Sequence, residues 1–188
     1  MSLQMNKNKH RLNISDIITL FRVFGTILLL FLKPLTIGFF CVYAFTGLTD
    51  VLDGFIARKT KTASDFGARL DSLADLLFYT IILIRLLPIL VIKLPNEIWY
   101  AVAVILCIRI SAYITAAVKY RRFASLHTYL NKFTGFAVFL ITFSLATAYA
   151  TVFCFAVCAV AAASSLEELV IHIRSKRYCP NVKSVFYK

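Results

Sequence analysis

The sequence predicts an all-α fold, that of a polytopic membrane protein with six transmembrane helices and a short interfacial segment at the amino terminus. Hydrophobic residues make up 60% of the 188 residues, and the mean hydropathy is +0.80. Several apolar runs approach the roughly 20 residues that a helix needs to cross a bilayer. The formal net charge of +12 comes from cations between these runs, which indicates anionic membrane lipids as partners and argues against nucleic acid.

The apolar runs follow one another with short polar breaks. Residues 1–13 are polar and basic, and we expect them to lie along the membrane surface. Lys33-Pro34 ends the first helix because proline cannot continue it, and residues 174–188 form a basic tail. We expect one membrane domain over residues 1–188. The predicted spans are 14–32, 35–56, 67–92, a run from beyond Glu97 to about 118, 133–148 and 151–170.

The distribution of cations predicts the orientation. The amino-terminal segment, the connections at 58–69 and 119–132 and the tail each carry several Lys or Arg residues, whereas the opposite turns carry essentially Lys33 and Lys93. Basic loops stay on the cytoplasmic side. We therefore expect a multi-pass protein of the cell membrane with both termini and the acidic stretch described next facing the cytoplasm.

Four of the nine Asp and Glu residues in the chain, at positions 50, 53, 71 and 75, are embedded in apolar sequence. An ionised carboxylate buried there without a partner is unfavourable. At 100° per residue, Asp50 and Asp53 lie on one face of a helix, and Asp71 and Asp75 lie on one stripe of the next. The two faces can converge around a hard divalent cation such as Mg²⁺ or Mn²⁺, which prefers oxygen ligands.

Small residues and one arginine accompany these acids. Gly54, Ala57 and Gly67 let a ligand or a neighbouring helix approach the backbone closely. Arg58 adds a planar set of donors suited to a phosphate group. The stretch therefore predicts a site for a divalent ion and a phosphorylated ligand.

The complete pattern, D-x2-D-G-x2-A-R-x8-G-x3-D-x3-D from Asp50 to Asp75, resembles the signature of the CDP-alcohol phosphotransferases at every specified position. Asn13, Thr19 and Arg22 are similar to the opening of the same family. The resemblance implies a six-helix integral membrane enzyme, usually a homodimer. Such an enzyme moves a phosphatidyl-type group from CDP-diacylglycerol to a small polar alcohol and releases CMP.

The resemblance also implies a role for each residue of the pattern. The metal ligands, for two Mg²⁺ or Mn²⁺ ions, would be Asp50, Asp53, Asp71 and Asp75. Asp75 would also act as the general base toward the acceptor hydroxyl. The residues implied to shape the CDP pocket are Gly54, Ala57, Arg58 and Gly67.

Cations elsewhere in the chain are candidates for acceptor binding. Arg109 lies in the middle of the fourth span, where it could bind an anionic acceptor or form a structural salt bridge. The basic residues that follow could bind the acceptor or face lipid headgroups. We expect Arg22, near the cytoplasmic end of the first span, to reach the headgroups, with a role in ligand binding as the less favoured alternative. The acceptor candidates are Arg109, Lys119, Arg121 and Arg122.

The identity of the acceptor stays open. The sequence Asp71-Ser-Leu-Ala-Asp75 looks closer to phosphatidylserine synthases than to phosphatidylglycerophosphate synthases, but the opening and Arg109 fit neither group. Glycerol 3-phosphate, serine and an inositol phosphate are therefore alternatives, with glycerol 3-phosphate preferred because cations suit a phosphorylated acceptor. A divalent-cation transporter, with the acids lining its path, is the alternative of another class.

Overall fold

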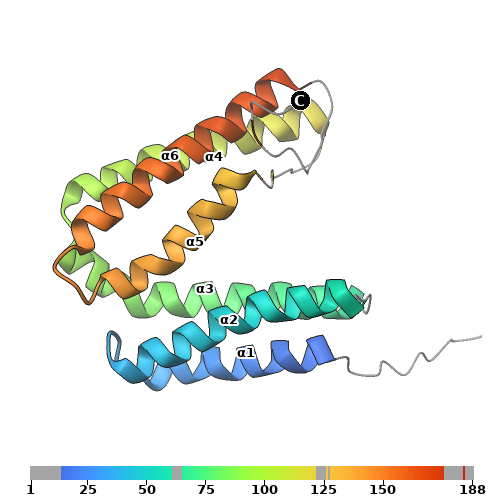
Figure 1. Ribbon diagram of the computed structural model, residues 1–188. Helices are drawn as coiled ribbons and strands as arrows, with labels where there is room; N and C mark the ends of the chain where they lie inside the picture. The colour runs from blue at the N-terminus through green and yellow to red at the C-terminus, as the bar shows by residue number, and fades with distance from the viewer. Residues whose placement is uncertain (1–13, 61–64, 122–125, 127, 176–183, 185–188) are drawn as a thin grey trace, which may run out of the picture. The chain divides into compact units, whose positions relative to one another are not determined.

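The computed structural model describes residues 14–60, 65–121, 126, 128–175 and 184, and all regular structure in these ranges is helical (Figure 1). The helices are α1 (Ile14–Phe31), α2 (Ile37–Thr60), α3 (Asp65–Lys93), α4 (Asn96–Tyr120), α5 (Tyr129–Ser144) and α6 (Ala150–Arg174). Each corresponds to one predicted span, which confirms the all-α fold. The predicted interfacial segment and most of the basic tail lie outside the described residues.

The chain forms two compact units, residues 1–88 and residues 89–188. The first unit contains α1, α2 and most of α3, and the second contains the end of α3 and the helices α4 to α6. The boundary falls at Pro88, which lies inside α3. Each unit is described by itself below.

The helices have the length and composition of membrane-embedded segments. Large apolar side chains lie on their outer surfaces, as Val118 does with 77% exposure, and lipid accommodates such surfaces better than water does. Among the residues that the structure describes, the segments long and apolar enough to cross a membrane are Leu70–Lys93, Asn96–Tyr120 and Ala150–Arg174, with shorter apolar helices at Ile17–Phe31 and Ile37–Asp50. The 16 residues of α5 give it a length of about 24 Å, less than the roughly 30 Å of a bilayer core. Six complete spans therefore remain a prediction.

The turn between α1 and α2 falls where Lys33-Pro34 predicts it. Leu35 adopts a left-handed φ of 61°, which is uncommon for a residue other than glycine. The Thr36 hydroxyl accepts a hydrogen bond from the Phe39 amide at 3.4 Å and so caps the start of α2. Arg85 of α3 donates to the carbonyl of Leu32, which satisfies the end of α1.

In the first unit, α1 and α2 lie side by side, and a glycine allows their close approach (Figure 1). A Cβ atom added at Gly25 would lie 2.9 Å from the Thr46 hydroxyl oxygen. That hydroxyl is buried and donates to the Val42 carbonyl at 2.7 Å. Helix α3 joins the pair through its side chains, since the Phe78 ring stacks on Tyr43 with centroids 5.5 Å apart. This packing brings the polar residues of the three helices together.

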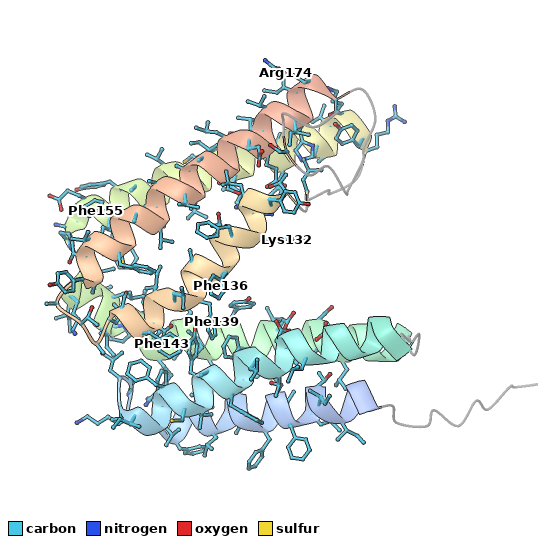
Figure 2. All side chains as sticks on the ribbon, viewed as in Figure 1. Lys132, Phe136, Phe139, Phe143, Phe155 and Arg174 are labelled. Atoms are coloured by element: carbon cyan, nitrogen blue, oxygen red, sulfur yellow. The ribbon has the colours of Figure 1, made fainter. Side chains whose placement is uncertain are left out.

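In the second unit, α6 packs against both α4 and α5. Leu94, Ile98 and Cys154 form its buried apolar cluster. Phe139 and Phe143 of α5, labelled in Figure 2, contact each other edge to face with centroids 5.8 Å apart. Ile141 of α5 packs against the Leu94 cluster, so apolar contacts join α5 to α4 and α6.

One end of the second unit is basic. The Lys119 ammonium group donates to the carbonyls of His172 at 2.9 Å and Ile173 at 2.7 Å, so the carboxyl ends of α4 and α6 meet there. The exposed residues Lys132 and Arg174 lie at the same end of the unit (Figure 2). A lysine at a helix carboxyl terminus is stabilised by the helix dipole. Lys119, one of the acceptor candidates, therefore has a structural role.

Replacing Gly25 with alanine tests the contact between α1 and α2. We expect Gly25→Ala to lower the free energy of unfolding by about 1 to 3 kcal/mol, because the added methyl group must displace a buried hydroxyl. Gly135→Ala is the matched control, since nothing lies within 4 Å of a Cβ atom there and alanine favours a helix over glycine. Thermal unfolding in detergent measures the stability of both variants. An unchanged melting temperature for Gly25→Ala would contradict the close approach.

Candidate functional site

Three carboxylates meet in the first unit, one from α2 and two from α3. Asp50, Asp71 and Asp75 each offer one oxygen atom, and these oxygens lie within 4.8 Å of one another. Asp71 and Asp75 are one turn apart on α3, so their side chains lie on the same face. The two acidic faces therefore converge, as their spacing predicts, for the three acids whose side chains are described.

The Arg22 guanidinium occupies the centre of this acidic cluster. Its Nη1 atom lies 2.9 Å from Oδ1 of Asp50, 2.9 Å from Oδ1 of Asp71 and 2.7 Å from Oδ1 of Asp75. The arginine side chain is 1% exposed, whereas the three carboxylates are 42% to 47% exposed. Arg22 thus reaches the acids from the buried side and leaves them open on the other. The expectation that it reaches lipid headgroups is wrong, because these carboxylates pair with it inside the unit.

The charge and geometry of the cluster fit a divalent cation. Three ionised carboxylates with one guanidinium carry a formal charge of −2, which one divalent ion would neutralise. Three oxygen atoms that already surround one cationic nitrogen also provide the hard donors that Mg²⁺ and Mn²⁺ prefer. The residues present therefore fit a metal of the predicted kind.

The rest of the acidic stretch is described only in part. Gly67 lies on α3 and is partly buried. The backbone of the carboxyl-terminal part of α2 is helical, but the side chains of four predicted site residues there lie outside the described part. These residues are Asp53, Gly54, Ala57 and Arg58.

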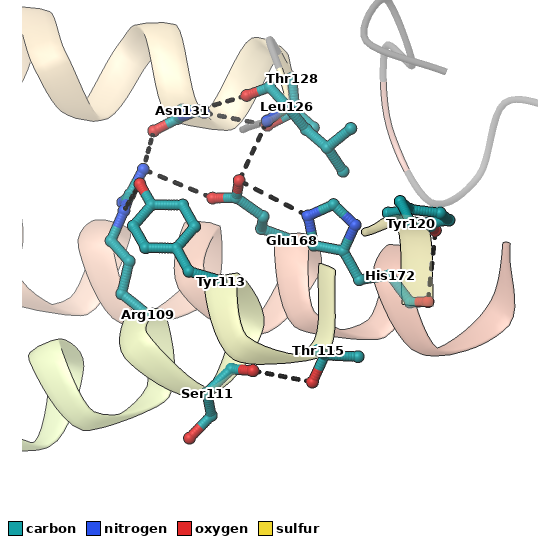
Figure 3. A network of polar contacts seen from close by, with 10 residues as sticks. All are labelled: Arg109, Ser111, Tyr113, Thr115, Tyr120, Leu126, Thr128, Asn131, Glu168 and His172. Atoms are coloured by element: carbon teal, nitrogen blue, oxygen red, sulfur yellow. Dashed lines mark hydrogen bonds and ion pairs between the residues drawn. The ribbon is translucent and has the colours of Figure 1, made fainter. Parts of the chain in front are cut away.

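A second polar cluster lies inside the second unit and contains Arg109 (Figure 3). The Arg109 guanidinium donates to Asn131 Oδ1 at 2.7 Å and to the Tyr113 hydroxyl at 3.2 Å. Its Nη2 atom lies 3.4 Å from Oε2 of Glu168, whose side chain is 2% exposed. The charge of Arg109 is therefore already compensated within the unit, which favours the structural salt bridge among the two interpretations of this residue.

The same cluster fixes the start of α5. The Leu126 amide donates to Glu168 Oε1 at 3.0 Å, and the Leu126 carbonyl accepts from Asn131 Nδ2 at 2.9 Å. The Thr128 hydroxyl accepts from the Asn131 amide at 3.1 Å and caps the helix. This capping starts α5 four residues earlier than the apolar run at 133–148 predicts. His172 lies one turn beyond Glu168 on α6, with Nε2 3.9 Å from Oε1.

The other acceptor candidates differ in what surrounds them. Lys119 contacts the two carbonyls at the end of α6. Arg121 is exposed and ends α4 in a left-handed conformation with φ of 53°. Arg122 lies outside the described residues. Arg121 is thus the candidate whose described side chain faces outward.

The sequence pattern does not predict several members of these clusters. It favours a headgroup contact for Arg22, and it assigns no role to Glu168, Asn131 or His172. A signal existed for Glu168 and His172, because two ionisable residues four apart in an apolar helix lie on one face and need a partner inside the protein. Arg109, four residues before Tyr113, is the cation that meets them.

Comparison with known families decides the class of protein. The family described as CDP-alcohol phosphatidyltransferase matches residues 12–166 of this chain, well over half of its length and including all of the acidic stretch. The chain belongs to the CDP-alcohol phosphatidyltransferase family. The resemblance first seen in the acidic stretch is thus confirmed over most of the chain. No solved structure matches the chain significantly.

Curated relatives from this family match a shorter part of the chain. A CDP-diacylglycerol–serine O-phosphatidyltransferase of Methanocaldococcus jannaschii is 35% identical over 68 residues, which cover 36% of this chain and 31% of the relative. A CDP-diacylglycerol–glycerol-3-phosphate 3-phosphatidyltransferase of Pseudomonas fluorescens is 38% identical over 80 residues, 40% of this chain and 41% of the relative. The corresponding protein of Wigglesworthia glossinidia brevipalpis is 37% identical over 82 residues, 41% of this chain and 45% of the relative. The chain thus spans less than half the length of each of these relatives.

The buried ion pair of the second unit can be tested by neutralising Glu168. We expect Glu168→Gln to destabilise the protein by roughly 3 kcal/mol, because it leaves the largely buried Arg109 charge without its acid. Glu97→Gln, at an exposed acid in the first turn of α4, is the control and should change stability little. Thermal unfolding in detergent gives both values. Equal melting temperatures for the two variants would show that the pair contributes nothing.

Proposed function

We propose that the chain transfers a phosphatidyl group from CDP-diacylglycerol to a small polar alcohol and releases CMP, with Mg²⁺ or Mn²⁺ as cofactor. The observation that carries this proposal is the convergence of Asp50, Asp71 and Asp75 to within 4.8 Å in a chain of this family. Family membership also argues against the divalent-cation transporter as the alternative. The acids that a transporter would need along a path are here gathered at one point.

The proposed metal ligands are the three clustered acids together with Asp53, for two ions. Ions bound there would neutralise the pyrophosphate charge of the lipid and stabilise the CMP that leaves. Gly54, Ala57, Arg58 and Gly67 would shape the CDP pocket, with the small residues leaving space and Arg58 donating to phosphate. The partial exposure of the three carboxylates supports this proposal, because a ligand can approach them from the side opposite Arg22.

In the proposed reaction, Asp75 takes the proton of the acceptor hydroxyl. The acceptor oxygen forms a bond to the phosphorus of the phosphatidyl group. The bond from that phosphorus to the oxygen that bridges to CMP breaks, and CMP leaves with the bonding electrons. The partial exposure of the Asp75 carboxylate supports this role, because an acceptor hydroxyl can approach it.

We propose glycerol 3-phosphate as the acceptor, with serine and an inositol phosphate as the alternatives. Two of the relatives described above are named for glycerol 3-phosphate and one for serine. An acceptor phosphate needs a cation, and exposed Arg121 and the neighbouring Arg122 are the better candidates. Arg109 and Lys119 could serve only by giving up their contacts with Glu168 and with the α6 carbonyls.

The proposed setting is the cell membrane, with six spans, both termini and the active site on the cytoplasmic side, and two copies of the chain in a homodimer. The basic end of the second unit supports this orientation. A soluble alcohol would reach the acids from the cytoplasm, while the acyl chains of the lipid stay in the bilayer.

Release of CMP from CDP-diacylglycerol by the purified protein tests the proposal. We expect turnover with Mg²⁺ or Mn²⁺ and glycerol 3-phosphate, loss of turnover on chelation, and loss again in Asp71→Asn, because one metal ligand is gone. Glu97→Gln is the matched control for loss of an acid and should keep its rate. Faster CMP release with serine or an inositol phosphate would identify that alcohol as the acceptor in place of glycerol 3-phosphate. Turnover of Asp71→Asn near the wild-type rate would refute the site.

Asp75→Asn separates proton transfer from substrate binding. We expect kcat to fall by about a hundredfold or more at every acceptor concentration, because the lost interaction belongs to the transition state. The KM for CDP-diacylglycerol should change much less than kcat. Steady-state kinetics with saturating metal measures both constants. A variant that keeps kcat and raises only KM would show that Asp75 binds substrate and does not act as the base.

A further inference from the structure

We propose that Arg22 competes with the metal ion for the acidic cluster: its guanidinium neutralises part of the charge of the three carboxylates and so weakens the binding of a divalent ion to them. This inference rests on the proposed function, since it takes the acidic cluster as a metal site. It adds a residue from α1, outside the acidic stretch, that sets how tightly the metal binds.

The distances place Arg22 against the carboxylates that would hold the metal ion. The Nη1 atom lies 2.7 to 2.9 Å from Oδ1 of Asp50, Asp71 and Asp75. Magnesium coordinates carboxylate oxygens at roughly 2.0 to 2.1 Å. A metal ion held by these oxygens would therefore lie within a few ångströms of the guanidinium. Two cations so close repel each other strongly in a partly buried site.

The burial of Arg22 explains why an arginine occurs at this position. Three carboxylates from two helices repel one another when no cation lies between them, which would separate α2 from α3. Arg22 enters from α1 on the buried side, with its side chain 1% exposed, and neutralises part of this charge. The carboxylates remain 42% to 47% exposed on the other side, where an incoming ion can reach them. Arg22 thus holds the three acids together without covering the exposed side of the cluster.

Neutralising Arg22 should have opposite effects on metal affinity and on stability. In Arg22→Gln we expect Mn²⁺ to bind at least about tenfold more tightly than in wild type, because a competing charge is gone. In chelator, the same variant should melt at a lower temperature than wild type, because the carboxylates lose their counter-ion. Arg22→Lys keeps the charge and should bind Mn²⁺ within a few fold of wild type. A residue that only positions the acids would instead lose affinity when replaced.

The experiment titrates the purified full-length protein in detergent with Mn²⁺ alone and follows free Mn²⁺ by electron paramagnetic resonance. Melting temperatures are measured with chelator and with Mn²⁺. Tighter binding in Arg22→Gln with lower stability in chelator supports the proposal, whereas equal or weaker binding overturns it. If Arg22→Gln does not fold without metal, recovery of the wild-type melting temperature in saturating Mn²⁺ supports the proposal and failure to recover overturns it.

Asp71→Asn distinguishes failure of this inference from failure of the proposed function. If the wild-type protein binds Mn²⁺ and Asp71→Asn does not, the acidic cluster is the metal site. That conclusion holds whatever the result for Arg22→Gln. Wild-type binding that Asp71→Asn does not alter places the ion elsewhere and overturns both. No binding in wild type or in Arg22→Gln also overturns both. No binding in wild type with clear binding in Arg22→Gln supports strong competition by Arg22.

Discussion

The contact of one buried guanidinium with three carboxylates is the interaction on which the arrangement of α1, α2 and α3 depends. Arg22, Asp50 and the pair Asp71 and Asp75 come from three different helices, so their 2.7 to 2.9 Å contacts join all three at one point. The close packing of α1 on α2 at Gly25 lies one turn away from Arg22 and keeps α1 near α2. The chemistry proposed for the cluster therefore depends on α1, although α1 supplies no predicted metal ligand.

The second unit neutralises its buried charge in a different way. Arg109 and Glu168 form an ion pair inside the unit, and the rest of the network consists of Asn131, His172, the hydroxyls of Tyr113 and Thr128, and backbone groups. Such a pair stabilises the packing of α4 and α6 and fixes the start of α5, but it leaves no excess charge for a ligand. The acidic cluster of the first unit keeps a formal charge of −2 and is open on one side. This difference is the physical reason to place the metal in the first unit.

The sequence predicted the features that depend on local pattern. Apolar runs and the break at Lys33-Pro34 located all six helices, and the four-residue spacing of Asp71 and Asp75 placed them on one face. Partners distant in the chain were harder to predict, because spacing within a helix does not indicate which cation another helix supplies. For this reason the sequence does not reveal that Arg22 meets the acids of α2 and α3, or that Glu168 meets Arg109, 59 positions earlier. The start of α5 was placed late because the cap at Thr128 precedes the apolar run.

The central claim is that Asp50, Asp71 and Asp75 surround a divalent cation. Anomalous scattering from crystals of the protein grown with Mn²⁺ tests it directly, because the signal locates the ion without reference to activity. The account predicts a manganese peak within about 2.0 to 2.6 Å of an oxygen from each of the three aspartates. A peak at another position, or none at this cluster in saturating Mn²⁺, would contradict it.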